Sequence, residues 1–186
     1  MRTPSRFAFV LVLAAAAGCG YSPNPPSMSL ICGPQSSCPE GYGCVDNTCW
    51  KQGQANLVGH WVFGAKSTQV VVCTDGSTQT DNLQGPEGFL DVMPGATSEL
   101  KAFYYCPWNL DIVGSATAIE SGQSCSAPDA ANPGVTYTWR GQTLAVTTND
   151  GKKGNLAASL PYDYVTLTGN GSCTLKIAAE LTKTFN

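Results

Sequence analysis

The chain has 186 residues, a formal net charge of −3, 42% hydrophobic residues and only 12% charged residues. This length fits one globular domain with a small additional module, and an acidic chain without a basic cluster excludes a typical nucleic-acid-binding protein. Hydroxyl and amide side chains are plentiful where charges are scarce, and Thr-rich strands are a usual source of such a surface.

Residues 1–18 have the organisation of an export signal. A short start with Arg2 and Arg6 precedes an apolar run from Phe7 to Ala17, and Gly18 follows it. The run is shorter than the ~20 residues of a transmembrane helix, so we expect a cleaved signal peptide. Removal of Arg2 and Arg6 would take the formal net charge from −3 to −5.

The end of this segment indicates how the mature chain is attached. Ala16-Ala17-Gly18-Cys19 resembles the lipobox of bacterial lipoproteins, in which the signal is cut before the cysteine and that cysteine carries the lipid. The resemblance implies lipidation at Cys19 and a partner that is the membrane itself. By the same resemblance, Gly20 in place of Asp favours the outer membrane, at its periplasmic face or the cell surface. The alternative is ordinary secretion with cleavage near Ala17.

The cysteine count agrees with export. The chain has nine cysteines, and an odd number in an exported protein requires an explanation. Lipidation of Cys19 leaves an even number, which an oxidising compartment would convert to disulfides. There is no C-x-x-C pair and His60 is the only histidine, so we expect neither a metal site nor a cofactor. The remaining cysteines are Cys32, Cys38, Cys44, Cys49, Cys73, Cys106, Cys125 and Cys173.

Residues 19–30 form the expected lipidated tether. Pro23, Pro25 and Pro26 disfavour both helix and sheet, and a Pro-rich segment adopts an extended conformation at ~3 Å per residue. Residues 51–56 form a second short linker, after the cysteine-rich segment 31–50.

Segment 31–50 is too short to bury a core, so covalent links must hold it. Its pattern C-P-x-G-x-x-C-x-x-x-x-C resembles small EGF-like and Dickkopf-type modules. Spacing alone leaves three connectivities open; the resemblance implies Cys32–Cys44 and Cys38–Cys49. Such a module presents recognition loops or serves as a stapled spacer. With the lipobox, it resembles small cysteine-rich envelope lipoproteins of myxobacteria.

Residues 57–186 are expected to form an antiparallel β domain. Short β-branched and aromatic runs alternate with turn signals, and Val135, Tyr137 and Trp139 share one face of a strand while Thr136 and Thr138 share the other. This pattern predicts an all-β fold, an antiparallel β-sandwich or barrel of roughly 8–10 strands. The expected strands are 61–63, 69–73, 89–93, 100–105, 110–113, 116–119, 135–139, 143–147, 164–167 and 173–178.

One turn suggests a disulfide. A hairpin at Gly114-Ser115 would place Val113 opposite Ala116 and bring Cys106 near residue 123. Cys125 is two positions away, so we expect Cys106–Cys125 and, from the cysteines that remain, Cys73–Cys173.

The sequence offers little for catalysis. His60 would have to serve any Ser-His-Asp triad, and no G-x-S-x-G motif occurs. We therefore expect no enzyme, with a hydrolase retained as the weakest hypothesis. Asp75, Asp81, Glu87 and Asp91 lie close together in sequence, but they lack the regular spacing of a calcium loop.

Gly59-His60-Trp61 is similar to the signature of the lipocalins. In that family the Trp closes one end of a barrel that holds an apolar ligand, so the resemblance implies a carrier with Trp61 at its cavity.

Exposed aromatics favour a different function. Phe103, Tyr104 and Tyr105 are consecutive, so a strand must place aromatics on both of its faces. Aromatic rings beside amide and carboxylate groups suit sugar binding, whereas core filling is the alternative. The candidate ligand-binding residues are Trp61, Tyr104, Tyr105 and Trp108. The leading hypothesis is a non-enzymatic envelope protein that binds another protein or a glycan; the second is a lipocalin-like carrier.

Overall fold

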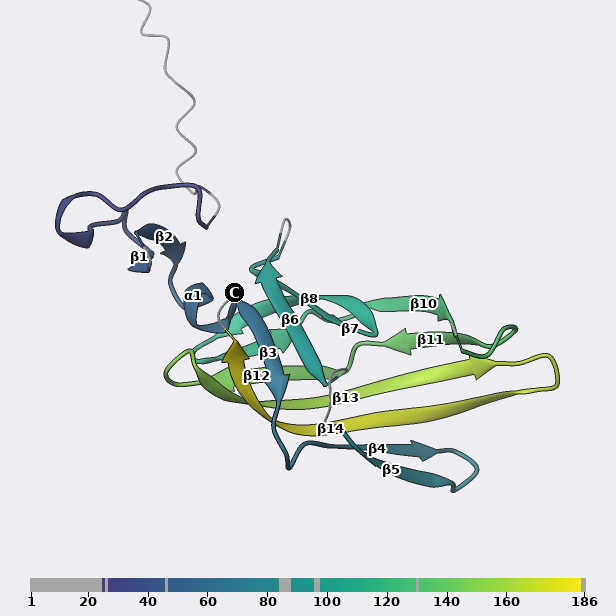
Figure 1. Ribbon diagram of the computed structural model, residues 1–186. Helices are drawn as coiled ribbons and strands as arrows, with labels where there is room; N and C mark the ends of the chain where they lie inside the picture. Colours follow the sequence, from purple (N-terminus) through teal and green to yellow (C-terminus); the bar gives the residue numbers. More distant parts are fainter. Residues whose placement is uncertain are drawn as a thin grey trace, which may run out of the picture.

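The computed structural model describes residues 25, 27–45, 47–83, 88–95, 98–129 and 131–184. The expected signal peptide, Cys19 and most of the tether lie outside these residues. The regular structure is almost entirely β (Figure 1), with a single 3-10 turn, η1, and one short helix, α1, in the described part of the chain. Among the described residues, no helix has the length and apolar character required to cross a lipid bilayer.

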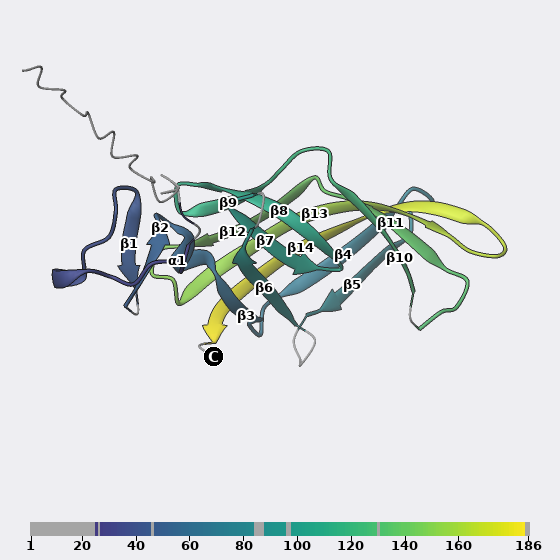
Figure 2. The same cartoon turned by 90° about the horizontal axis from the view of Figure 1, so that it is seen from above.

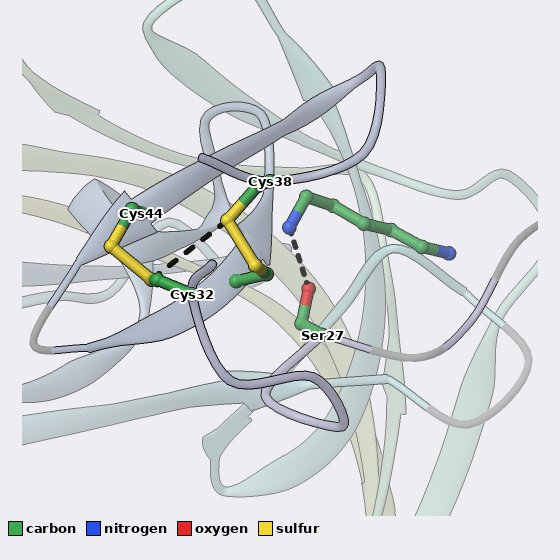
Figure 3. Close-up of a disulfide and its surroundings, with 6 residues drawn as sticks. Ser27, Cys32, Cys38 and Cys44 are labelled. Carbon is green, nitrogen blue, oxygen red and sulfur yellow. Dashed lines mark hydrogen bonds between the residues drawn. A yellow bond between two sulfur atoms is a disulfide. The ribbon is translucent and has the colours of Figure 1, made fainter. Parts of the chain in front are cut away.

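The cysteine-rich module is a two-stranded hairpin held by two disulfides. It contains η1 (Pro34–Ser36), β1 (Tyr42–Val45) and β2 (Thr48–Lys51). Cys32 bonds to Cys44 and Cys38 to Cys49, the two pairs that the EGF-like resemblance implied. Figure 3 shows the two bridges side by side, with 3.9 Å between the sulfurs of Cys32 and Cys38. Three sulfurs here lie within 4.8 Å of one another, but each belongs to a disulfide and offers no thiolate.

The second part of the chain is an antiparallel sheet of twelve strands among the described residues. α1 (Gln54–Leu57) precedes it. The strands are β3 (Gly59–Phe63), β4 (Thr68–Cys73), β5 (Thr78–Asn82), β6 (Phe89–Pro94), β7 (Leu100–Tyr104), β8 (Cys106–Val113), β9 (Ala116–Ile119), β10 (Ser124–Pro128), β11 (Thr136–Arg140), β12 (Thr143–Thr148), β13 (Lys153–Val165) and β14 (Asn170–Thr184).

These twelve strands occupy eight positions in the barrel wall, because some positions hold two strands that lie end to end. β14 pairs with β4 along Cys173–Ala178 and with β3 along Leu181–Thr184, so β3 and β4 lie end to end beside it. The same relation joins β5 to β6, β9 to β10 and β11 to β12. β7, β8, β13 and β14 each occupy one position of the wall alone.

These eight positions close into an up-and-down barrel. Around the ring the order is β3, β6, β7, β8, β9, β12, β13 and β14, and β14 pairs again with β3. The contact between β9 and β12 has the fewest paired residues in the wall, Ala116 with Thr147, beside a main-chain hydrogen bond from Thr148 N to Ser115 O at 3.1 Å. The Thr117 hydroxyl completes it: Oγ1 donates to Leu144 O (3.3 Å) and accepts from Val146 N (2.9 Å). A side chain thus replaces part of the main-chain ladder.

α1 covers one end of the barrel. Trp61 is fully buried, and its indole N–H donates to Leu57 O at 2.8 Å. The Lys183 side chain crosses this end; its Nζ lies 5.0 Å from the centre of the Trp61 ring and donates to Ala55 O at 3.1 Å. Gly59 has φ +147°, and a Cβ there would approach Lys183 Cδ to 2.9 Å. Glycine therefore leaves the space that the lysine stem occupies, and burial lowers the Lys183 pKa.

The barrel interior is filled with side chains. Residues with no accessible surface include Trp61 and Trp108, together with Leu90, Leu100, Leu110, Val146 and Leu160. A side chain without accessible surface has no neighbouring void large enough for a water molecule, so these residues form a packed core.

The opposite end of the barrel is open along one side. The hairpin of β7 and β8 turns at the single residue Tyr105, so both strands end at this level of the barrel. β13 and β14 continue beyond it. β10, β11, β4 and β5 continue beside them, so six strands form a curved half-barrel beyond the closed ring. Figures 1 and 2 show this extension at the end of the molecule opposite the cysteine-rich module and α1. Cys106–Cys125 ties the start of β8 to β10, and Cys73–Cys173 ties β4 to β14.

The all-β antiparallel fold with a preceding disulfide-rich module is confirmed, and of the two expected architectures the structure is the barrel. The hairpin at Gly114-Ser115 has the expected pairing of Val113 with Ala116. The expected strand 173–178 lies within the longer β14, which has 15 residues. The expected strand 164–167 overlaps only Tyr164 and Val165 at the end of β13, which has 13 residues and begins at Lys153. Pro161 lies in β13 where that strand has left β12 and has not yet met β11, a position where one edge lacks a neighbour and a proline is tolerated.

Candidate functional site: a tyrosine groove at the open end

The inner face of the half-barrel forms a groove. It consists of two adjoining hollows of about 420 and 430 Å³ that share Val71, Tyr137 and Tyr162. Hollows of this size accommodate small organic molecules. The first is also lined by Gln69, Tyr105, Ala127, Pro128, Asp129, Trp139 and Leu175, and the second by Cys73, Ser77, Thr78, Gln79, Val135, Tyr164, Thr166 and Cys173.

Strand alternation delivers the aromatic rings to this face. Tyr137 and Trp139 on β11 pair with Tyr164 and Tyr162 on β13, and all four point inward. The intervening residues point outward, as the sequence pattern predicted.

Outside the groove, hydrogen bonds join the same strands. Asp163 accepts from both Arg140 guanidinium nitrogens, with Nη2 at 3.1 Å from Oδ1, and from the Ser172 hydroxyl at 2.6 Å. The wall therefore has an aromatic inner face and a hydrogen-bonded outer face.

The rings form a continuous cluster. Tyr105 stacks on Trp139 with centroids 4.8 Å apart and planes inclined by 12°. Trp139 lies 4.4 Å from Tyr162, and Tyr137 meets Tyr162 edge-on at 5.7 Å. Aromatic pairs at these separations attract one another through their ring quadrupoles. Because each ring restrains its neighbour, the cluster presents a fixed surface.

Tyr105 is the most accessible ring of the cluster. Its side chain is 56% exposed, whereas Trp139 is 7% exposed and Tyr162 is 9% exposed. Its φ is +56°, in the left-handed region that side chains other than glycine seldom adopt. A strained, exposed aromatic at the tip of a two-strand connection is a feature that functional sites often carry.

Amide groups supply polarity on the β4–β5 side. Gln69 Nε2 donates to Asp81 Oδ2 at 3.2 Å, and Gln79 Nε2 donates to the same carboxylate at 3.0 and 3.1 Å. Gln69 Oε1 is buried and has no hydrogen-bond partner within the described residues. A buried acceptor without a donor is costly unless water or a ligand satisfies it. This oxygen is therefore a polar contact available to a bound molecule.

Asp129 supplies a second carboxylate, on the β10–β11 side. It accepts from Ala131 N at 2.8 Å, from Asn132 Nδ2 at 2.7 Å and from the Tyr137 hydroxyl at 3.3 Å. These hydrogen bonds, that from the Asn132 side chain first, lower the Asp129 pKa and keep it ionised. The lining residues include no lysine or arginine, so the groove is aromatic, polar and weakly acidic.

Three tyrosines in or beside the groove, Tyr104, Tyr137 and Tyr162, are protonated at neutral pH. Burial raises the pKa of Tyr104, Tyr162 and Tyr137, and neighbouring tyrosines or, for Tyr137, Asp129 raise it further. Their hydroxyls therefore act as hydrogen-bonding groups here, and proton transfer at neutral pH is disfavoured.

Sequence reasoning placed only part of this site. Of its four candidate residues, Tyr105 lines the groove, and Tyr104 lies half-buried between Phe63 and Tyr105. Trp61 and Trp108 do not line the groove: both are fully buried, and each indole donates to a main-chain carbonyl four residues earlier. The residues missed were Tyr137, Trp139, Tyr162, Tyr164 and Gln69. The alternation of residues 135–139 was the available signal.

His60 and Asp91 form a second arrangement, outside the groove. His60 Nδ1 lies 2.6 Å from Asp91 Oδ1, and the Phe89 ring lies against the imidazole at 4.8 Å. The hydroxyl of its strand partner, Thr184, donates to the main-chain carbonyl of His60 at 3.3 Å. A triad would need that hydroxyl on the ring nitrogen. The Thr184 hydroxyl is therefore not placed as an activated nucleophile.

Glu87 lies outside the described residues. Asp75 is occupied locally, since it accepts from the main chain and the hydroxyl of Ser77, and these bonds lower its pKa. Asp81 and Asp91 bond to different partners, as described above, so the sequence cluster of acids does not converge on one site.

No family model, curated protein or solved structure matches this chain.

Proposed function

We propose that this chain is an exported lipoprotein of the bacterial cell envelope, anchored through Cys19, with a non-enzymatic binding role carried by the tyrosine groove. A chain with acyl groups on Cys19 would be held stably at a membrane, because two hydrophobic anchors already suffice. The four disulfides agree with an oxidising compartment outside the cytoplasm.

One observation favours binding in the groove over binding in the barrel. The closed part of the barrel is packed with side chains such as Trp108 and Leu110 that have no accessible surface, while Tyr105 beside it is 56% exposed. Ligands need accessible concave surface with a few polar groups, and the groove has both. In an anchored molecule it would also face away from the membrane, since the half-barrel that carries it lies at the end opposite the module that follows the tether (Figure 2).

A lipocalin-like carrier is the second candidate, and the up-and-down order of eight strands favours it. Barrels of this order hold one small ligand in several families. The filled interior argues against an apolar molecule inside. The groove lining also argues against it, because tyrosine, glutamine and aspartate side chains suit a polar ligand.

Site-specific photo-crosslinking in cells tests the binding role. A benzophenone amino acid in place of Tyr105 is expected to yield a covalent adduct on irradiation. The same amino acid in place of Phe103, 41% exposed on the same short hairpin but outside the groove lining, is the matched control and is expected to yield none. Equal labelling at both positions, or none at either, contradicts a binding site in the groove.

The Cys19→Ala variant tests the anchor. The variant is expected to leave the membrane fraction and to remain folded, because Cys19 precedes both the module and the barrel in the sequence. Retention of the variant in the membrane fraction would rule out lipidation at this position.

A further inference from the structure

We infer that the tyrosine groove binds a neutral oligosaccharide of at least two sugar rings. This inference rests on the proposed function and names the ligand of the same groove.

The accessible tyrosine rings are suited to sugar faces. A pyranose presents several C–H groups on one face, and these carry partial positive charge toward the negative face of an aromatic ring. Tyr105 offers such a surface, and Trp139 holds its ring in place from behind at 4.8 Å. A prepared, rigid platform lowers the entropic cost of binding a flexible polar chain.

The polar groups complement sugar hydroxyls. Gln69 Oε1 is a buried acceptor without a partner in the described chain, so it needs a donor. A sugar hydroxyl supplies one. The Gln69 amide cannot simply turn to satisfy itself, because its Nε2 is held by Asp81 at 3.2 Å. An apolar ligand would leave this oxygen unsatisfied, at the cost of a buried hydrogen bond.

Charge restricts the class of glycan. Asp129 lies in the groove lining and Asp81 is bonded to both glutamines of the opposite side. Among the residues that the structure describes, the lining includes no basic side chain to balance them. An acidic polysaccharide would therefore be repelled, which leaves neutral sugars.

The shape of the groove indicates the length of the ligand. The two hollows adjoin along Tyr137 and Tyr162, and the aromatic residues Tyr105 and Tyr164 lie in different hollows. A single sugar would occupy only one of them. A chain that spans both would contact two aromatic surfaces, so affinity should rise with chain length.

An array of neutral linear oligosaccharides of hexoses and N-acetylhexosamines tests the inference, with oligogalacturonic acid as the acidic comparison. The full chain is used in a zwitterionic detergent, because detergents with sugar head groups would compete. Calorimetry on the best neutral glycan then gives the affinity. We expect binding of at least one neutral tetrasaccharide, about tenfold or more tighter than its monosaccharide, and no binding of the acid.

Two variants connect binding to the groove. Tyr105→Ala is expected to weaken the affinity about tenfold, because it removes the stacking surface, and Gln69→Leu about three- to tenfold, because it removes the acceptor. Phe103→Ala, which removes a comparably exposed ring outside the groove, is expected to change the affinity less than twofold. A cooperative thermal unfolding transition well above the temperature of the binding experiment shows that the fold of each variant is intact.

Two results overturn the inference. One is an array without a bound neutral glycan, and the other is glycan binding that survives both groove variants. The crosslink at position 105 separates this failure from failure of the proposed function. An adduct that contains a protein, with an empty array, leaves the binding role standing and replaces the glycan by a protein ligand. An empty array without any adduct at position 105 overturns both.

Discussion

The Tyr105 ring stacks on Trp139 across the junction between the short hairpin β7–β8 and the long wall of the half-barrel, 4.8 Å apart and nearly parallel. This contact, with the nearby disulfide between Cys106 and Cys125, fixes where the closed barrel ends and the groove begins. The Tyr105 ring is therefore exposed because β7 and β8 end before the strands of the long wall do.

The backbone of Tyr105 allows its structural and binding roles to be separated. Tyr105→Gly should change the free energy of unfolding by less than about 1 kcal/mol. Glycine removes the cost of the left-handed backbone conformation, about 1–2 kcal/mol, and this gain offsets the lost ring contacts and the greater entropy of the unfolded chain. Tyr105→Ala keeps the strain and loses the ring, so it should be about 1 kcal/mol less stable than Tyr105→Gly in urea unfolding. Equal stability of the two variants would contradict a left-handed conformation here.

The contact between β9 and β12, the seam of the barrel, relies in part on the Thr117 hydroxyl. Thr117→Val keeps the side-chain volume but leaves Leu144 O and Val146 N without their buried partner. We expect a loss of about 2–4 kcal/mol in the free energy of unfolding. Thr117→Ser retains the hydroxyl and loses one methyl group, so its loss should be about 1 kcal/mol. Chemical denaturation measures both, and an equal loss in the two variants would show that the hydroxyl does not complete the seam.

The disulfides of the half-barrel differ in the loop that each closes. Cys73 and Cys173 are separated by 100 residues, and Cys106 and Cys125 by 19. Replacing both cysteines of the first pair by serine should lower the free energy of unfolding by about 5 kcal/mol, and replacing those of the second pair by about 3 kcal/mol. The reason is that the longer loop gains more entropy in the unfolded chain. A greater loss from the shorter loop, measured by the same unfolding experiment, would show that local packing outweighs loop entropy.

Acid should loosen the outer face of the half-barrel. The Arg140 guanidinium, and then the Ser172 hydroxyl, lower the pKa of Asp163 from 3.8 to about 2. A carboxyl group whose pKa is lower in the folded state stabilises the fold fully at a pH above its pKa in the unfolded chain. This stabilisation is lost as the pH falls through its pKa in the folded protein. Stability should therefore fall between about pH 4 and pH 2, and Asp163→Asn should remove part of this dependence. A pH profile of unfolding that is identical in Asp163→Asn would contradict the interaction.

The fold was predictable because its signals are local. Turn residues such as Gly114 and the alternation of Tyr137 and Trp139 are visible in sequence, and they fix hairpins and faces. β13 was harder to recognise, since its alanines and Pro161 have low strand propensity. Its buried alternation of Leu156, Ala158 and Leu160 becomes meaningful only beside the partner strands.

The site was less predictable because it depends on which strands end early. Trp61, Trp108 and Trp139 look alike in sequence, yet only Trp139 lies where the wall continues past β7 and β8. The surroundings of Gln69 also include β14, which pairs with β4 but lies far from it in the sequence. No spacing within one segment reports these relations.

A native mass spectrum of the protein, extracted gently from its own membrane, tests the central claim of an anchored chain with a filled barrel. We predict a chain that begins at Cys19, carries acyl groups, has four disulfides and retains no apolar molecule. An unmodified Cys19, free thiols, or a bound apolar molecule would contradict this account, and the last of these would transfer support to a carrier.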